Sequence, residues 1–398
     1  MNILLLEKIH PVAARALRAQ GWNITTENKS LTGDALLKAT RKAVALGIRS
    51  KTKVNAEVID NSEKLICVTC FCIGSDQVDL AACAERGIAV FNAPYSNTRS
   101  VSELALGHII MLMRGVIDSN AAMHQGTWKK SANHRYEVRG KTLGIVGYGH
   151  IGSQISVLAE ALGMEVLFYD IRESLAMGNA RRTRSLKELL KSSDVVTLHV
   201  PDTTATRGMI GPAELRTMKK GALLINTSRG KVVKIEALKD ALLKKHLRGA
   251  AIDVFPSEPG SNGPGWDCPL RGLPNVILTP HIAGSTQEAQ REIGASASSK
   301  MIRFLAEGAT IGALNFPQLD LPPLDRRHRL IHVHKNVPGV ISHIGSVLKR
   351  HKINIEGQHL ETTDKLGYLV TDIDHPVKGD LVQDLRATPN TLRVRVLF

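Results

Sequence analysis

The chain has 398 residues, 43% of them hydrophobic, so it can bury a large core and should form two or three domains. Its formal net charge is +15, but the basic residues form no long block and aromatic residues make up only 4%, which argues against nucleic-acid binding. No uncharged apolar run reaches the roughly 18 residues of a membrane span, and the N-terminus does not resemble a secretory signal, so we expect a cytoplasmic protein.

The first hundred residues alternate short apolar runs with helical stretches. The expected strands are Asn2–Leu6, Ala43–Ile48, Leu65–Thr69 and Ile88–Phe91, and the expected helices are Pro11–Gln20 and Asp79–Glu85. This alternation predicts a parallel α/β sheet.

Two of the five cysteines, Cys67 and Cys70, have the C-x-x-C spacing of a redox or zinc pair, and Cys72 is close to them in sequence. However, no second pair follows at zinc-site spacing, and the cysteines lie in a β-like run. We therefore interpret them as small, buried apolar side chains, and we expect neither a metal site nor a disulfide framework.

A second alternating series follows a helix expected at Ser102–Arg114. Its expected strands are Leu143–Val146, Glu165–Asp170, Val195–Val200, Ala222–Asn226, Ala250–Val254 and Val276–Thr279. Six such strands separated by helical stretches predict a doubly wound sheet of the dinucleotide-binding kind.

The last part of the chain follows a proline-containing segment, Phe316–His328, that favours an extended linker. Beyond it the pattern is strand, helix, strand, strand, helix, strand. The elements with the clearest pattern are Arg329–His334, Pro338–Lys352, Gly367–Asp374 and Leu392–Leu397. This order predicts a small ferredoxin-like βαββαβ module.

A glycine motif, G-x-G-x-x-G at 147–152, lies between an expected strand and an expected helix. In that context Gly147 allows a tight turn, Gly149 lets the backbone approach a pyrophosphate, and Gly152 lets the helix pack on the sheet. The free N–H groups of the helix would bind the phosphates. Asp170, which ends the next strand, can accept hydrogen bonds from ribose hydroxyls and would repel a 2′-phosphate. NAD is therefore the expected cofactor, although Arg172 is compatible with NADP.

Three polar residues follow later strands of this series, at the edge where an open α/β sheet binds its ligands. His281 is a suitable base for a hydroxyl proton. Glu258 could orient that base and raise its pKa, and Arg229 could bind a substrate carboxylate and carbonyl oxygen. Each residue alone is more typical of an ordinary loop. Their placement at successive strand ends behind a dinucleotide motif favours an active site for hydroxy-acid oxidation.

The ordered motifs resemble the D-isomer-specific 2-hydroxyacid dehydrogenase family over essentially the whole chain, most closely its bacterial members with a C-terminal ACT domain. Residues 92–101, 146–152 and 279–290 carry the strongest similarity. The resemblance implies that Arg229, Glu258 and His281 are the catalytic set. It also implies NAD contacts from Gly147, Gly149, His150, Ile151, Gly152, Asp170, Thr227, Ser228, Asp253 and Gly284.

The resemblance also implies a domain organisation. A discontinuous substrate-binding domain would comprise residues 1–98 and 284–315, and a Rossmann-type NAD-binding domain residues 99–283. A linker at 316–328 would lead to an ACT regulatory domain at 329–398. The expected fold class is therefore α/β, with two doubly wound parallel-sheet domains and a ferredoxin-like ACT domain. The active site would lie in a cleft between the first two domains.

The segment from Arg49 to Lys53 is the candidate site for the far end of the substrate. Its cations and its Ser and Thr donors suit a phosphate group, although Lys51 stands where a second arginine is common in the family and lacks the bidentate geometry of arginine. The resemblance adds Lys130 from a dimer-arm loop, and a backbone turn at Ile73 and Gly74 that faces the substrate carboxylate. The alternative for Lys51 and Lys130 is that they are solvated surface lysines.

In the C-terminal module the resemblance implies an L-serine effector site formed by His334, Asn336 and Asn354. Val337, where an arginine is common, and Lys234, where the family usually has Asp, depart from the pattern. The alternative is that the module serves only oligomerisation. Paired modules and a dimerisation arm near Val101–Arg139 imply a homotetramer.

The sequence therefore predicts NAD-dependent oxidation of 3-phospho-D-glycerate to 3-phosphohydroxypyruvate, the first step of L-serine biosynthesis, inhibited by L-serine. Reduction of 2-oxoglutarate is compatible with the resemblance. One alternative is another substrate such as glyoxylate or hydroxypyruvate, but such enzymes usually lack the ACT module. Another is an NAD-sensing transcriptional corepressor, which keeps the three polar residues but carries a disordered C-terminal tail.

Overall fold

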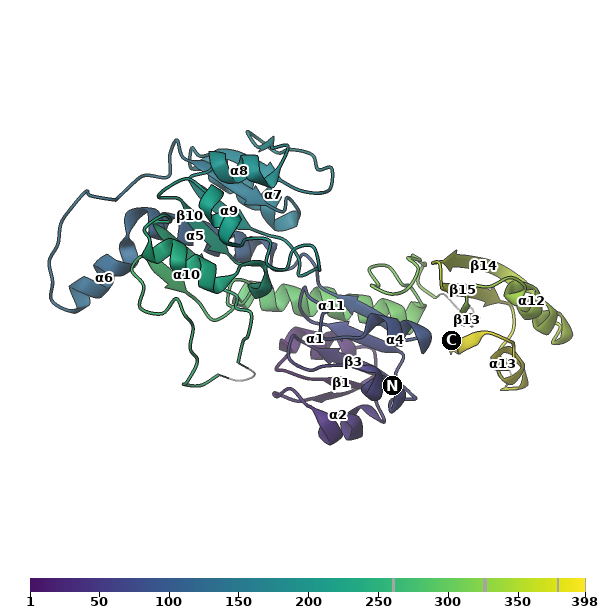
Figure 1. The fold of residues 1–398 in the computed structure, drawn as a ribbon. Helices are drawn as coiled ribbons and strands as arrows, with labels where there is room; N and C mark the ends of the chain where they lie inside the picture. Colours follow the sequence, from purple (N-terminus) through teal and green to yellow (C-terminus); the bar gives the residue numbers. More distant parts are fainter. Residues whose placement is uncertain (260–261, 325–327, 378, 398) are drawn as a thin grey trace. The chain divides into compact units, whose positions relative to one another are not determined.

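The computed structural model describes residues 1–259, 262–324, 328–377 and 379–397 of the chain (Figure 1). The chain forms two compact units. The first unit comprises Met1–Ser96 together with Gln290–Phe398, and the second comprises Asn97–Ala289. The first unit is therefore built from two segments that are far apart in the sequence.

A five-stranded parallel sheet in the order β2-β1-β3-β4-β5 forms one part of the first unit. Its strands are β1 (Asn2–Leu5), β2 (Asn23–Thr26), β3 (Ala45–Ile48), β4 (Cys67–Cys70) and β5 (Ala89–Asn92). The helices associated with it are α1 (Pro11–Arg18), α2 (Gly33–Thr40), α3 (Ala56–Asp60), α4 (Leu80–Glu85) and α11 (Gln287–Glu307). The strands β3, β4 and β5 are fully buried and mostly apolar, as expected of a parallel sheet with both faces covered.

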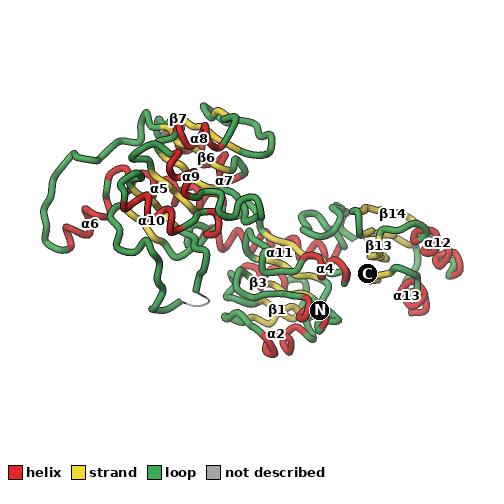
Figure 2. Tube along the Cα trace, in the orientation of Figure 1, coloured by secondary structure: helices red, strands yellow, loops and turns green. Residues whose placement is uncertain are grey.

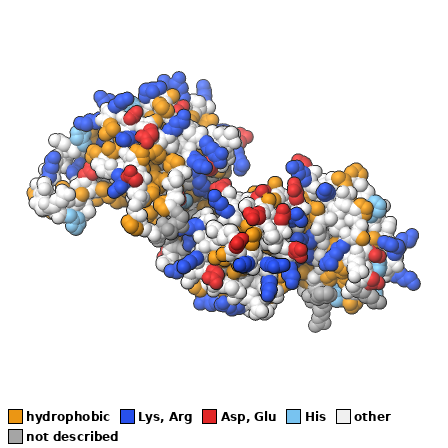
Figure 3. Space-filling view, turned by 60° about the horizontal axis from the view of Figure 1, so that its bottom comes forward, with side chains coloured by type: hydrophobic (Ala, Val, Ile, Leu, Met, Phe, Trp, Pro, Cys, Tyr) orange, Lys and Arg blue, Asp and Glu red, His pale blue; other side chains and the backbone are white. Residues whose placement is uncertain are grey.

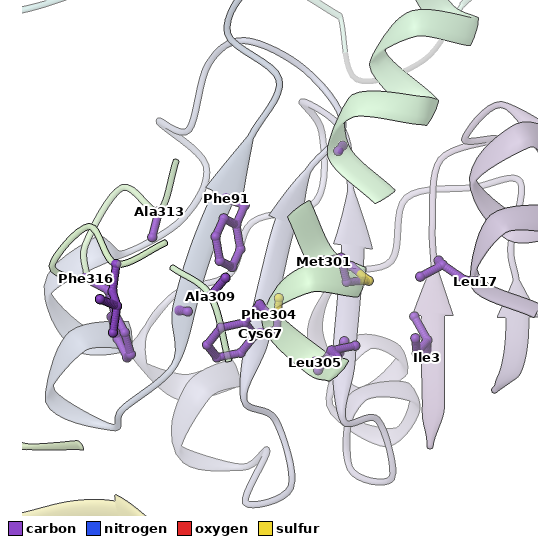
Figure 4. Close-up of a cluster of buried hydrophobic side chains, with 14 of the residues drawn as sticks. Ile3, Leu17, Cys67, Phe91, Met301, Phe304, Leu305, Ala309, Ala313 and Phe316 are labelled. Carbon is purple, nitrogen blue, oxygen red and sulfur yellow. The ribbon is translucent and has the colours of Figure 1, made fainter. Parts of the chain in front are cut away.

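Residues of these strands alternate between two cores, one on each face of the sheet. Cys67 and Phe91 pack with Phe304 of α11 in one core (Figure 4), whereas Cys70 enters the core on the opposite face. Cys67 and Cys70 are thus fully buried free thiols, as the sequence predicts. Burial raises the pKa of Cys67 to about 12, so its thiol is protonated at neutral pH.

The second unit contains a seven-stranded parallel sheet in the order β12-β11-β10-β9-β6-β7-β8 (Figure 2). Its strands are β6 (Thr142–Val146), β7 (Glu165–Tyr169), β8 (Arg181–Arg182), β9 (Val195–Leu198), β10 (Leu223–Asn226), β11 (Gly249–Ile252) and β12 (Val276–Leu278). Its helices are α5 (Thr98–Arg114), α6 (Val116–His124), α7 (His150–Ala161), α8 (Leu186–Ser192), α9 (Pro212–Thr217), the 3-10 turn η1 (Gly230–Val232) and α10 (Ile235–Leu243). The six expected strands are present. The sequence does not predict β8, because this edge strand consists of two exposed arginines without an apolar pattern.

The C-terminal module is a four-stranded antiparallel sheet in the order β14-β15-β13-β16, with the expected βαββαβ sequence of elements. Its elements are β13 (His328–Lys335), α12 (Val340–Arg350), β14 (Ile355–Thr362), β15 (Leu366–Ile373), α13 (Gly379–Arg386) and β16 (Thr391–Leu397). One face of the sheet packs on α12 and α13. The other face contributes Ile331, Val333 and Tyr368 to the core that contains Phe304 of α11.

The segment expected as a linker is largely packed against the first unit. Phe316, Leu319 and Leu321 are buried in the same core as Phe304, and Thr310 is hydrogen-bonded to Pro317 and Leu319. The prolines favour extended backbone, but the apolar residues between them gain free energy by burial. Residues 325–327 of the expected linker lie outside the described residues.

Charged side chains of both signs lie on the face of the molecule that Figure 3 shows. On the face in Figure 3, Lys and Arg side chains are interspersed with Asp and Glu, which agrees with the scattered basic residues in the sequence. No single helix among the described residues is long and apolar enough to cross a membrane. Helices α5 and α6, bent by 68° with respect to each other, meet the length and composition criteria only as a pair.

A buried ion pair anchors the C-terminal module. Arg329 on β13 is 1% exposed, and its Nε and Nη2 donate to the two carboxylate oxygens of Asp372 on β15 at 2.6 and 2.9 Å. Its Nη1 donates to the carbonyl of Glu307, the last residue of α11, at 2.7 Å. This side chain therefore joins two strands of the module to the C-terminal end of α11, where a cation is favoured.

We expect Asp372→Ala to lower the free energy of unfolding of the first unit by about 3–5 kcal/mol, because it leaves the Arg329 charge buried without a counter-ion. Urea unfolding followed by circular dichroism measures the change. The matched control is Asp60→Ala in the same unit, which removes the exposed pair between Arg86 and Asp60 and should cost about 1 kcal/mol or less. Equal losses for the two variants would contradict this account.

Candidate active site

Three neighbouring strands bring the candidate catalytic residues to one edge of the second sheet. β10, β11 and β12 are parallel, and their pairing aligns Asn226 with Ile252 and Ile252 with Leu278. The loops that leave these strands therefore begin at the same level. They carry Arg229, Glu258 and His281, all in the second unit.

His281 and Glu258 form a hydrogen-bonded pair. The distance between His281 Nδ1 and Glu258 Oε2 is 2.8 Å, and both side chains are partly exposed. The hydrogen bond that His281 donates to the Glu258 carboxylate raises the pKa of His281 against the opposing effect of burial. Burial would raise the pKa of Glu258, but the hydrogen bonds from His281 and from the Phe255 backbone lower it. The imidazolium form of His281 is therefore stabilised, which suits a group that accepts and returns a proton near neutral pH.

Arg229 is half-buried, and its charge lowers the pKa of both members of the pair. Asn226 holds its loop: the Asn226 side chain accepts from Ser228 N–H and Oγ and donates to the Arg229 carbonyl. A Cβ on Gly230 would lie 2.0 Å from the Phe255 carbonyl carbon, so glycine is required where the Arg229 loop meets the segment leading to Glu258. The sequence does not reveal this role of Asn226, because its partners are backbone groups of a loop.

Asp253 organises the loop that carries His281. Its carboxylate is fully buried and accepts hydrogen bonds from Thr279 Oγ1 at 2.6 Å and from the backbone N–H groups of Ile282 and Ala283 at 2.9 Å. His281 itself has φ +55°, a left-handed conformation that is costly for a residue other than glycine. These bonds fix that conformation. The resemblance predicts a cofactor contact for Asp253, and the structure adds this positioning of the His281 loop.

The loop between β6 and α7 has the shape that a dinucleotide pyrophosphate requires. A Cβ on Gly152 would lie 2.2 Å from the Gly147 carbonyl oxygen, and a Cβ on Gly147 2.6 Å from the His199 carbonyl oxygen, so neither position admits a larger residue. A Cβ on Gly149 would meet no atom within 4 Å, which leaves its backbone open to a ligand. Near the end of β10, the buried Oγ1 of Thr227 has no hydrogen-bond partner in the described residues. These features fit a bound dinucleotide.

Asp170 directly follows β7, as the sequence predicts. Its carboxylate accepts from the backbone N–H of Tyr148 at 2.7 Å and from that of Arg172 at 2.8 Å. It thus holds the glycine loop in addition to its expected contact with the ribose. The remaining expected contacts lie around this edge: His150 and Ile151 open α7, Ser228 lies in the Arg229 loop, and Gly284 follows Ala283.

The candidate substrate segments lie in the first unit, where β3 and β4 end next to each other. Gln77 joins them, because its Nε2 donates to the Arg49 carbonyl at 2.6 Å and lies 3.4 Å from the Gly74 carbonyl. Asn92 Nδ2 donates to the Ile73 carbonyl at 2.6 Å. The structure thus brings the Arg49 loop and the turn at Ile73 and Gly74 together.

A buried carboxylate that the sequence does not single out supports the Arg49 loop. Glu7 is 7% exposed, and its carboxylate accepts from the backbone N–H groups of Lys51 at 3.0 Å and Thr52 at 2.8 Å. Glu7 has φ +64° at the end of β1, a turn that aims its side chain across the sheet edge. No sequence pattern signals this contact, because 44 residues separate Glu7 from Lys51.

The other residues expected to bind ligands are Lys130 and three residues of the C-terminal module. Within one chain, the hydrogen bonds of the described residues do not join them into a site. Lys130 is exposed in a segment without regular structure. In the C-terminal module, Asn336 and Asn354 are exposed, but His334 is 2% exposed and a Cβ on Gly367 would lie 2.2 Å from its Nε2. In the described part of the chain, no hydrogen bond joins His334 to either asparagine.

Comparison with known protein families gives two matches. Residues 106–283 match the family described as D-isomer specific 2-hydroxyacid dehydrogenase, NAD binding domain. Residues 330–393 match the AHAS small subunit-like ACT domain. The first match contains the glycine loop and the three loops that carry Arg229, Glu258 and His281.

Curated relatives are similar over the whole chain. D-3-phosphoglycerate dehydrogenase of Escherichia coli strain K12 is 49% identical over 401 residues, which cover 100% of this chain and 98% of the relative. The enzyme of the same name from Dictyostelium discoideum is 46% identical over 398 residues, covering 100% and 97%. This similarity confirms the family resemblance that the sequence motifs indicate.

Solved structures share the fold of most of the chain. The TT0316 protein from Thermus thermophilus has a TM-score of 0.72 at 34% identity and covers 79% of this chain and 100% of its own. The D-lactate dehydrogenase of Aquifex aeolicus, solved with NAD and lactic acid, has a TM-score of 0.70 at 28% identity and covers 80% and 100%.

We expect Glu258→Gln to lower kcat by about 100-fold and to shift the pH profile of kcat/KM towards lower pH. The carboxylate raises the pKa of His281, so without it the imidazole loses its proton at a lower pH. If His281 is the base of hydroxy-acid oxidation, its neutral form is needed and the acidic limb of the profile should move to lower pH. In the reverse reaction, which needs the imidazolium, the alkaline limb should move down as well.

Steady-state rates in both directions between about pH 5 and pH 10 measure these shifts. The matched control is Glu236→Gln, which changes an exposed glutamate of α10 outside the site and should leave both limbs in place. A profile that only falls in height, without moving, would show that Glu258 does not set the pKa of His281.

Proposed function

The chain belongs to the D-isomer specific 2-hydroxyacid dehydrogenase family and is an NAD-dependent oxidoreductase, and we propose that it oxidises 3-phospho-D-glycerate to 3-phosphohydroxypyruvate, the first step of L-serine biosynthesis. The observation that carries the proposal is the 49% identity to D-3-phosphoglycerate dehydrogenase along the full chain. The hydrogen-bonded pair of His281 and Glu258 supports it, because it lies at the same sheet edge as the dinucleotide loop.

In this proposal each residue has a separate task. NAD, when bound by the glycine loop, supplies the acceptor for the hydride from the substrate C2. His281 removes the C2 hydroxyl proton, and Glu258 orients the imidazole and stabilises its charged form. Arg229 binds the substrate carboxylate and polarises the C2 oxygen with its guanidinium. Asn226 and Asp253 position the loops that carry Arg229 and His281.

The phosphate end of the substrate is assigned to the first unit. Arg49 and Lys51 supply positive charge there, and Lys130 of the second unit is a further cation. The turn at Ile73 and Gly74 faces the substrate carboxylate. The Glu7 carboxylate supports this assignment, because it holds the backbone at Lys51 and Thr52 in place. Residues 1–98 with 284–315 would thus form the substrate-binding domain, and residues 99–283 the NAD-binding domain.

We further propose that residues 329–398, which follow the linker at 316–328, form a regulatory ACT domain that binds L-serine at His334, Asn336 and Asn354, in a cytoplasmic homotetramer. The match to an ACT family at 330–393 supports the regulatory domain, and the side chains of the two asparagines are accessible. Because His334 is buried in a single chain, its contact with serine would require the ring to turn outward.

The direct test follows NADH oxidation by the purified full-length chain with 3-phosphohydroxypyruvate, with and without L-serine. We expect rapid turnover that L-serine suppresses and D-serine does not. Turnover without any effect of L-serine would retain the enzyme and reject the effector site. Reduction of glyoxylate or 2-oxoglutarate, without turnover of 3-phosphohydroxypyruvate, would reject the phosphate assignment of Arg49 and Lys51.

Glu7→Gln should raise the KM for 3-phosphohydroxypyruvate by about tenfold or more. A glutamine amide can accept only one of the two hydrogen bonds, and a charge-assisted hydrogen bond contributes about 1.5–3 kcal/mol. The KM for NADH should remain unchanged, because Glu7 lies in the first unit and the dinucleotide loop in the second.

Steady-state kinetics with each substrate varied in turn provide this comparison. Glu27→Gln removes an exposed carboxylate close to β2 in the same unit and serves as the control. An equal rise in both KM values would indicate a general loss of structure rather than a role in the substrate loop.

A further inference from the structure

Three arginines line a cavity on the first unit that has no part in the proposed reaction. The cavity has a volume of about 410 Å³ and is lined by Arg386, Arg393 and Arg395, together with Ile66, Thr391, Leu392 and Val394. Small-molecule sites have volumes of about 300–1,000 Å³. No Asp or Glu is among the lining residues, so the cavity is strongly cationic.

The sheet geometry explains why these charges lie together. Arg393 and Arg395 are two residues apart on β16, so both point to the same face of the sheet. That face packs on the core that contains α11, whereas Val394 between them packs on the opposite side against α12 and α13. The two guanidinium groups are thus held at the seam between the C-terminal module and the first sheet of the same unit.

Backbone carbonyls accept hydrogen bonds from two of these guanidinium groups. Arg393 donates through Nε and Nη2 to the Arg86 carbonyl at 3.3 and 3.2 Å. Arg395 donates through Nη2 to the carbonyls of Phe304 and Leu305 in the last turn of α11, and it lies over the Phe304 ring at 4.5 Å. Carbonyl oxygens bear partial charges, so these contacts orient the guanidinium groups without neutralising them.

One donor in the cluster has no partner. Arg395 Nη1 is buried, and it has no hydrogen-bond acceptor in the described part of the chain. An unsatisfied buried donor on a charged group costs free energy. In the described residues, no ion pair within 4.0 Å joins any of the three arginines to a carboxylate.

The neighbouring positive charges and burial act on the pKa of the clustered guanidinium groups. Burial, followed by the charges of Arg395 and Arg386, lowers the pKa of Arg393 to about 10. Burial also lowers the pKa of Arg395. Like charges in a partly buried site are unfavourable unless an opposite charge accompanies them.

We propose that this cavity is a binding site for a small oxyanion of the phosphate type, held by Arg386, Arg393 and Arg395 at the seam between the C-terminal module and the first sheet. Arginine suits this ligand, because its planar fork donates two parallel hydrogen bonds to phosphate oxygens. The site is separate from the candidate substrate segment at Arg49 and Lys51, which follows the end of β3 and contributes no residue to the cavity. A bound anion stabilises the packing of β16 on α11, because it neutralises the cations that β16 places there.

The test uses the full-length chain and inorganic phosphate as the probe, with sodium chloride adjusted to keep the ionic strength constant. Isothermal titration calorimetry measures the affinity, and thermal unfolding measures the stabilisation. All variants carry Arg49→Gln, which removes a cation of the candidate substrate site. Phosphate binding that remains in this background, and that weakens when a cavity arginine is also substituted, therefore reports on the cavity.

In that background we expect Arg386→Gln and Arg393→Gln each to weaken phosphate binding by about tenfold, the effect of losing one charge-assisted hydrogen bond. Arg386 is exposed at the end of α13, so its substitution tests the site without disturbing the buried seam. Arg18→Gln, which removes an exposed arginine of α1 in the same unit, should leave phosphate affinity unchanged.

Three results would overturn the proposal. They are a loss of all phosphate binding on Arg49→Gln alone, an unchanged affinity in both cavity variants, or equal stabilisation by chloride at matched ionic strength. None of them bears on the catalytic assignment, because turnover of 3-phosphohydroxypyruvate is measured separately. If the wild-type chain does not turn over 3-phosphohydroxypyruvate but binds phosphate at the cavity, the proposed function is rejected and the anion site is retained.

Discussion

The candidate active site depends on the parallel, in-register pairing of β10, β11 and β12. The last residues of these three strands are paired with one another. Three loops that are distant in the sequence therefore start from one edge of the sheet and can direct an arginine, a glutamate and a histidine towards one substrate. A slip of one residue would turn the alternate side chains of a strand to the other face. It would also separate Glu258 from His281, which are now 2.8 Å apart. The geometry of the candidate active site therefore depends on the correct register of these strands.

Carboxylates that bind backbone N–H groups stabilise the loops at these edges. Asp253 holds the His281 loop, Asp170 holds the glycine loop, and Glu7 holds the loop that follows β3. A carboxylate is an effective organiser of a loop, because it accepts several hydrogen bonds at once and each is strengthened by its charge. A loop held in this way presents its side chains without reorganising when a ligand binds, which is the condition for electrostatic stabilisation of a transition state.

The C-terminal module combines two kinds of packing on the two faces of one sheet. One face has the ordinary apolar contact with α12 and α13. The other face mixes apolar residues with Arg329, Arg393 and Arg395 and meets the C-terminal end of α11. Asp372 neutralises Arg329, but β16 brings no such partner for its own arginines among the described residues. Arg329 thus has a counter-ion and joins the module to α11, whereas the arginines of β16 form the anion site that we propose.

The sequence by itself determined the α/β class, the six main strands of the second sheet, the βαββαβ module and the family, because these depend on local periodicity, on glycines at fixed spacing and on ordered motifs. Only the tertiary structure decided which side chains support the site. The contact of Glu7 with Lys51 and Thr52 joins residues far apart in the chain, and the cavity at Arg393 exists only because β16 packs on α11. Neither the two-residue strand β8 nor the burial of His334 has a local signal. Such features depend on strand register and on the packing of one element against another, and no short stretch of sequence encodes either.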